Sequence, residues 1–151
     1  MKDLLIKETQ EAYSQNDEMS LLCSVRSLTQ EEAEWRLNKT IWSIEEVLFH
    51  VASCKIEYCK QGFGKWQGDY PKPFGNIHEM LAFLDRAQTH LLECLRGCTE
   101  EDLQKPIPTR FHGESAAHFF WIMIMHDISH GAQIRTIRRA YGTRTDYYPV
   151  R

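Results

Sequence analysis

The sequence lacks a hydrophobic run long enough for a membrane span, which needs about 18 apolar residues. It also lacks the apolar stretch of a signal peptide, because Lys2, Asp3 and Lys7 place charges near its N-terminus. There is no excess of positive charge to indicate nucleic acid or an anionic membrane as a partner, since the formal net charge is −3. We therefore expect a cytoplasmic protein that binds neither nucleic acid nor membranes.

Cysteine is present, but no CxxC motif occurs among the five cysteines. An odd number of cysteines and a reducing compartment argue against a disulfide framework. Cys94 and Cys98 stand four residues apart in a helical pattern, so they can share one helix face. Free cysteine is commonly buried, and we expect these thiols to be small core side chains rather than reactive groups.

Strand-like alternation is absent, and four long segments have helical periodicity instead. The predicted helices cover residues 3–26, 43–62, 76–97 and 115–141, and a short helical turn starts at Thr29. The polar run from Ser14 to Asp17 could interrupt the first helix. Pro71 and Pro73 lie in the loop before the third helix, and Pro106 and Pro108 lie before the fourth. The sequence predicts one all-α domain, a four-helix bundle spanning residues 1–151.

The second helix has the clearest N-terminus. Ser43 is its predicted N-cap, and Glu46 completes a capping box. Trp42 and Val47 have the spacing of a hydrophobic staple. An apolar stripe at helical spacing then faces the core. It comprises Val47, Val51, Cys54 and Tyr58.

Two histidines in the last helix indicate a metal site. His126 and His130 are four residues apart, so both imidazoles lie on one face and can reach one ion. The neighbours at heptad-like spacing turn that face toward the interior; they are Ile122, Ser129, Gln133 and Ile137. An unpaired polar group there costs roughly 1–3 kcal/mol, and the neighbouring sequence offers no acceptor for two imidazoles. Metal coordination would satisfy both.

His50 is the predicted third ligand. It lies about 60° from the centre of its helix's apolar stripe at ~100° per residue, which places it at a seam between helices. Three histidines with open positions for water are typical of a catalytic site rather than a closed structural one. Imidazole ligands suit zinc, nickel, iron or copper. Cys54 stands four residues after His50 and is a rival ligand, although its place in the apolar stripe favours ordinary burial.

The segments Trp42-Ser43-Ile44-Glu45-Glu46-Val47-Leu48-Phe49-His50-Val51 and His126-Asp127-Ile128-Ser129-His130-Gly131-Ala132-Gln133-Ile134 resemble the DinB-like metalloprotein superfamily. Its members are four-helix bundles with one histidine from the second helix and an HxxxH pair from the last. The resemblance covers essentially the whole chain, in order and in length. It implies that His50, His126 and His130 bind a divalent metal ion, with zinc or nickel expected first.

The resemblance also implies a range of activities. Related proteins include metal-dependent hydrolases, and transferases or isomerases that use low-molecular-weight thiols such as bacillithiol or mycothiol. The metal would lower the pKa of a bound water in the first case, or hold a thiol as thiolate in the second. We expect a hydrolase or thiol S-transferase acting on a small molecule. The alternatives are a metal or small-molecule binder without turnover, and a helical interaction domain whose histidines are structural.

Three further residues are candidates for the chemistry. Glu46 and Glu57 lie on roughly the same side of the second helix as His50, and either is a candidate general base. His118 precedes the histidine pair on the same face, either lining the entrance or bonded to backbone in the core. Gln133 is expected to pack beneath His130 or to donate a hydrogen bond to its surroundings, rather than to touch substrate. We also expect a homodimer, because small helical bundles often bury a spare apolar face.

Overall fold

The computed structural model describes residues 1–64, 66–70, 75–108 and 114–143. Within these ranges the chain is helical, and its β-type pairing is one isolated bridge between Pro106 and Ser115. The helices are α1 (Lys2–Gln10), the π-helix η1 (Glu11–Gln15), α2 (Leu21–Ser24), α3 (Gln30–Glu34), α4 (Ile44–Gly62), α5 (Ile77–Gly97), the 3-10 helix η2 (Asp102–Gln104) and α6 (Ala116–Tyr141).

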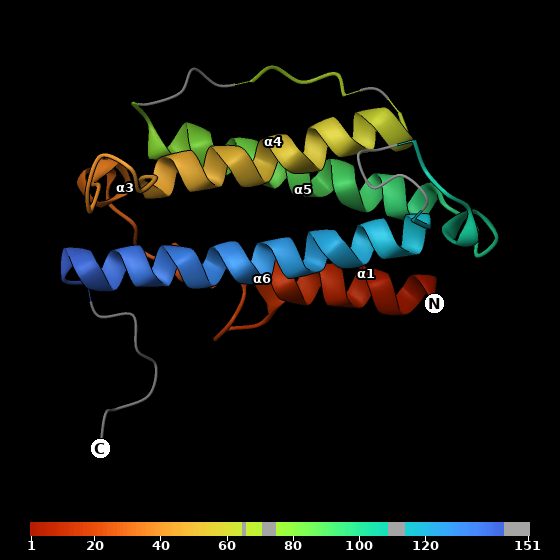
Figure 1. Cartoon of the computed structure of the whole chain (residues 1–151), viewed down its shortest axis with the longest axis horizontal. Coiled ribbons are helices and arrows are strands. Elements are labelled where there is room, and N and C mark those ends of the chain that lie inside the picture. The colour runs from red at the N-terminus through yellow and green to blue at the C-terminus, as the bar shows by residue number, and fades with distance from the viewer. Residues whose placement is uncertain (65, 71–74, 109–113, 144–151) are drawn as a thin grey trace.

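Four of these helices form the predicted bundle (Figure 1). In Figure 1, α4 and α5 lie side by side and run in the same direction, while α1 and α6 form a second pair that runs the opposite way. Two parallel neighbours cannot be joined by a tight turn, so the connection from α4 to α5 takes residues 63–76. Residues 71–74 of the predicted loop, with Pro71 and Pro73, lie outside the described ranges.

The first predicted helix is too long. Instead of running to residue 26, it ends with η1 at Gln15, and a separate short helix α2 follows. Asn16 leaves the helical conformation, with φ −91° and ψ 110°, and its side-chain oxygen accepts hydrogen bonds from the backbone N–H groups of Glu18 and Met19 at 3.0 and 2.8 Å. An asparagine side chain that satisfies the backbone in this way competes with helix continuation. The break therefore falls inside the polar run from Ser14 to Asp17, where an interruption of the first helix was expected.

The other long helices begin and end close to their predicted bounds. The capping box of α4 is present, with the Ser43 N–H donating to Oε2 of Glu46 at 2.7 Å and the Glu46 N–H donating to Oγ of Ser43 at 3.3 Å. Asn76 and Ser115 cap α5 and α6 with side-chain oxygens that accept hydrogen bonds from backbone N–H groups of the first turn. Gly142 ends α6 in the left-handed region at φ 108°, a conformation that glycine adopts without steric cost.

A buried polar layer divides the apolar core. The side chain of Lys55 in α4 is fully buried, and its Nζ donates to Oδ2 of Asp127 in α6 at 2.7 Å and to Oε1 of Gln88 in α5 at 2.6 Å. Gln88 in turn donates to the carbonyl of Thr9 in α1 at 3.3 Å. One ammonium group therefore links all four bundle helices. Burial lowers the pKa of Lys55 and raises that of Asp127, while the attraction between the two groups opposes both shifts.

A second buried ion pair fixes the short helices against α6. Arg138 donates from Nε to Oε1 of Glu32 at 2.7 Å, and its Nη1 donates to the carbonyls of Ser24 and Arg26 at 2.9 and 3.0 Å. These contacts hold α2 and α3 in place.

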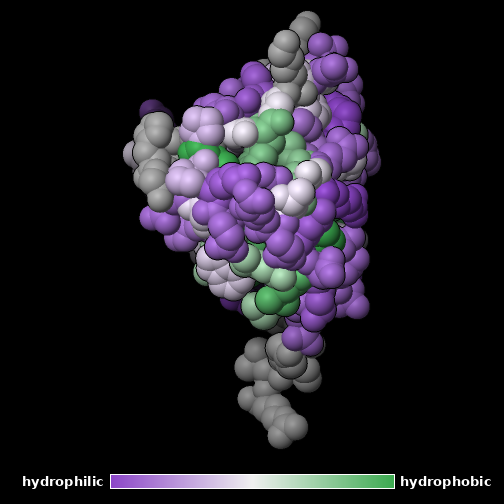
Figure 2. Space-filling model, turned by 90° about the vertical axis from the view of Figure 1, so that its right-hand side faces the viewer, coloured by the Kyte–Doolittle hydropathy of each residue, from purple (hydrophilic) through white to green (hydrophobic). Residues whose placement is uncertain are grey.

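The described helices include none with both the length and the apolar character to cross a lipid bilayer. Figure 2 views the molecule from the end that carries the N-terminus, and this face is mostly hydrophilic with smaller hydrophobic areas between polar groups.

Replacing Lys55 by Met should destabilise the fold by about 3–5 kcal/mol, because the Asp127 carboxylate is left buried without its counter-charge. Urea unfolding followed by circular dichroism measures the change. The matched control is Lys60→Met on the same helix, whose exposed pairing with Glu57 is worth less than about 1 kcal/mol. The double variant Lys55→Met/Asp127→Leu should recover much of the loss. Equal stability of the Lys55→Met and Lys60→Met variants would contradict the buried role.

Candidate metal centre

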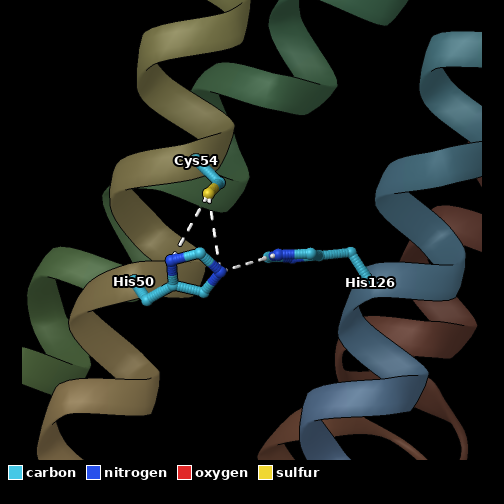
Figure 3. Close-up of side chains that lie close together, drawn as sticks. All are labelled: His50, Cys54 and His126. Atoms are coloured by element: carbon cyan, nitrogen blue, oxygen red, sulfur yellow. Dashed lines mark hydrogen bonds between the residues drawn. The ribbon is translucent and has the colours of Figure 1, made fainter.

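The three predicted histidine ligands lie together between α4 and α6. The ring centroid of His50 is 5.2 Å from that of His126 and 5.0 Å from that of His130, and the last two are 4.4 Å apart. The Nε2 atoms of His50 and His126 lie 3.2 Å apart (Figure 3). Residues separated by 76 positions in the sequence thus present imidazole nitrogens to one another across a helix seam.

The separation of these nitrogens fits a common ion. Two imidazoles on a tetrahedral zinc ion, each about 2.0–2.1 Å from the metal, have nitrogens about 3.3 Å apart. The Nε2 atoms of His50 and His126 lie 3.2 Å apart, so they need little movement to share a metal. A hydrogen bond between one protonated and one unprotonated imidazole has the same separation and is the metal-free account of the contact. This pair of nitrogens therefore fits a divalent metal, and coordination by all three histidines stays a prediction.

His130 is oriented by Gln133. The Nδ1 of His130 lies 2.8 Å from Oε1 of Gln133, an oxygen that accepts a hydrogen bond. The Nδ1 of His130 is therefore the protonated nitrogen, and in the neutral ring Nε2 carries the lone pair. Metal-binding histidines commonly donate their other N–H to such a partner, which fixes both tautomer and ring orientation. Gln133 packs against His130, as the sequence indicated.

Cys54 lies closer to the site than an ordinary core cysteine would. Its Sγ is 3.7 Å from both ring nitrogens of His50, and the potential ligand atoms of His50, Cys54 and His126 all lie within 4.8 Å of one another. His130 is outside this group. A sulfur equally distant from both nitrogens of one ring lies off the lone-pair axis of each, and Figure 3 shows it beyond the ring edge between the two nitrogens. Cys54 is half-buried, so it remains the rival ligand.

The sequence also matches a known protein family. The family model of the DinB superfamily matches residues 15–134. The chain belongs to the DinB superfamily. His50, His126 and His130 all lie within the matched part of this DinB chain, as does Gln133. Comparison of the DinB chain with curated proteins and with solved structures gave no match.

A pocket of about 460 Å³ opens beside His50 in this DinB protein. Its walls are largely apolar, with carboxyl and hydroxyl groups among them. The lining residues are Trp42, Glu45, Glu46, Phe49, His50, Ser53 and Met80. A largely apolar cavity with a few polar groups is typical of a small-molecule site.

Glu45 is a buried carboxyl group in the pocket wall that the sequence pattern did not single out. Its side chain is only 1% exposed, and Oε1 accepts a hydrogen bond from the backbone N–H of Gly75 at 3.3 Å. Burial raises the pKa of Glu45, because the charged form loses solvation. A carboxyl group with a raised pKa in a pocket is a candidate for proton transfer.

The two glutamates predicted as helpers lie in different surroundings. Glu46 lines the pocket, but its carboxylate is held by the Ser43 N–H and by Arg36. Glu57 is on the surface, where hydrogen bonds from Tyr70 and Lys60 lower its pKa. Neither arrangement leaves a carboxylate poised to accept a proton beside His50.

His118 lies away from the histidine pair. It is eight residues before His126, about 12 Å along the axis of α6. Its side chain is exposed, with Nδ1 3.7 Å from Glu114. The core position that the sequence allowed for His118 is therefore wrong.

Trp42 contacts the site rather than acting as a core staple. Its side chain is 44% exposed, and its ring centroid is 5.0 Å from that of His50. In the sequence Trp42 has the spacing of a staple residue before the N-cap, but that spacing did not indicate the contact with His50. Trp42 covers one side of the His50 ring at the pocket mouth.

Glu45→Gln should make the protein more stable at neutral pH. The pKa of Glu45 is raised on folding, so its stabilising contribution is complete below the unfolded value of about 4.3 and is lost as pH rises through the folded value. The variant should therefore exceed the parent in stability at pH 7, and the difference should vanish near pH 4. Denaturant unfolding across this range measures it.

The matched control is Glu57→Gln on the same helix. The pKa of Glu57 is lowered, so this change should show the opposite and weaker pH trend. A Glu45→Gln variant that is less stable than the parent at pH 7 would contradict the assignment of a destabilised buried carboxylate.

Proposed function

We propose that the protein is a metal-dependent hydrolase that holds one divalent ion between α4 and α6 through His50, His126 and His130. The observation that carries the proposal is the 3.2 Å approach of Nε2 atoms from two helices, with a third imidazole beside them. Membership of the DinB superfamily supports the same ligand set. Imidazole donors favour zinc or nickel over magnesium or calcium, which prefer oxygen ligands.

A metal bound at these histidines supplies Lewis acidity and makes an attacking water more acidic. The chain's own residues then hold and orient the site. Gln133 keeps the Nε2 lone pair of His130 available, and the ring of Trp42 lies against that of His50. Each contact favours one orientation of the histidine ring that it touches.

Glu45 is the group we assign to proton transfer in this hydrolase. It lies in the pocket wall with His50, and its raised pKa allows it to accept and return a proton at a pH where an exposed glutamate stays ionised. The apolar walls formed by Trp42, Phe49 and Met80 fit a substrate with an apolar body. The carboxyl groups of Glu45 and Glu46 disfavour a strongly anionic substrate. The substrate class is thus a small neutral amide or ester.

Single replacements of the three histidines by Ala should weaken zinc or nickel binding by at least about 100-fold, since each removes a ligand. Gln133→Leu should weaken binding by about 10–100-fold, because the His130 tautomer is no longer fixed. His118→Ala is the matched control, since this exposed histidine is on the same helix. Isothermal titration calorimetry with the untagged protein measures each affinity. Unchanged affinity in all three histidine variants, with circular dichroism showing an intact fold, would remove the assignment.

The reaction is tested by screening the zinc and nickel forms against neutral amides and esters, and against thiols paired with electrophiles. We expect hydrolysis that requires His126, and a fall in kcat of about 100-fold or more in Glu45→Gln. The His118→Ala control should keep full activity. Turnover of only the thiol pairs would replace the hydrolase with a thiol S-transferase. Metal binding without turnover in either class would favour a non-catalytic metal or small-molecule binder.

A further inference from the structure

A second cluster of soft metal ligands lies between α4 and α5. Cys59 projects from α4, and His90 and Cys94 stand four residues apart on α5. The potential ligand atoms of the three side chains all lie within 4.8 Å of one another, and Nε2 of His90 is 3.9 Å from Sγ of Cys94. None of these residues contributes to the histidine centre described above.

The cluster is separate from the histidine centre. Cys59 follows Cys54 by five residues, which is about 7.5 Å along α4 and about 140° around it at ~100° per residue. Cys54 therefore faces the seam with α6, while Cys59 belongs to the packing between α4 and α5. An ion in one site does not use the donors of the other.

The spacing of the donors fits a thiophilic ion. On a tetrahedral zinc ion, with Zn–S of about 2.3 Å and Zn–N of about 2.0–2.1 Å, sulfur and nitrogen ligands lie about 3.6 Å apart, and two sulfurs about 3.8 Å. The 3.9 Å between His90 and Cys94 is within a few tenths of an ångström of this value.

The cluster has access to solvent. His90 and Cys94 are half-buried and line a pocket of about 600 Å³, whose wall also includes Cys98 and Asp102. Cys59 is fully buried behind them. The ring of Trp66 lies 5.3 Å from that of His90 and restricts its orientation. An ion can therefore enter from the pocket, with one coordination position left for water or a small ligand.

We propose that Cys59, His90 and Cys94 form a second metal site that binds zinc or another thiophilic cation. Binding is a proton exchange without oxidation. The cation forms two metal–sulfur bonds and one metal–nitrogen bond, the two S–H bonds break, and both protons go to solvent. Two thiolates neutralise the divalent charge, which suits a site with a buried donor.

Titration with Cd²⁺ tests this site, because thiolate coordination produces charge-transfer absorption in the near ultraviolet. The full-length protein is kept reduced and carries Cys54→Ser, so the histidine centre contributes no thiolate. We expect absorption that saturates with one ion per chain and has the intensity of two thiolates. Cys94→Ser should remove at least half of that intensity. His90→Ala should keep the intensity and weaken binding by about tenfold or more.

Cys98→Ser is the matched control, since this thiol lines the same pocket but is outside the ligand group. It should leave both intensity and affinity unchanged. His90 and Cys94 are half-buried, so their replacement leaves the core intact, which circular dichroism checks. The proposal is overturned if no thiolate absorption develops, if it survives Cys94→Ser at full intensity, or if Cys98→Ser abolishes it equally.

Discussion

The buried ammonium group of Lys55 is the constraint on which the rest of the bundle depends. A charge in the interior is tolerated only with a counter-charge and hydrogen bonds, and these come from Asp127 and Gln88. This fixes the rotation of α4 and α6 about their axes. At about 100° per residue, His126 and His130 lie about 60–100° to one side of Asp127, so the pair faces the seam toward α4. The charged layer thus positions the site without touching it.

Much of this arrangement follows from local sequence rules. Capping signals act over three or four residues, and they fixed the start of α4 at Ser43 and the end of α6 at Gly142. The i, i+4 spacing of His126 and His130 places both rings on one face in any helix. His50 lies in a different helix. Its place at the margin of the apolar stripe made it the predicted third ligand, and the DinB resemblance implied the same residue.

The remaining features depend on contacts between distant segments. In the sequence Lys55 resembles a surface lysine. Its burial could not be predicted, because burial of a charge depends on its partner, which here is Asp127. Glu45 resembles any acidic residue in a first helical turn, and only the backbone of Gly75 and the pocket wall distinguish it. The pairing of Cys59 with α5 likewise required the packing of α4 against α5. The polar run from Ser14 to Asp17 indicated a possible break in the first helix. The side-chain hydrogen bonds of Asn16 in the structure show that the helix ends there.

The central claim is that three imidazoles, rather than two imidazoles and a thiolate, hold the ion between α4 and α6. X-ray absorption spectroscopy tests it on the Cys94→Ser protein loaded with slightly less than one equivalent of zinc, so that the second cluster is impaired. The account predicts nitrogen or oxygen donors alone at about 2.0–2.1 Å, with outer-shell scattering from three imidazoles that falls to two in His130→Ala. A sulfur donor at about 2.3 Å that disappears on Cys54→Ser would contradict it.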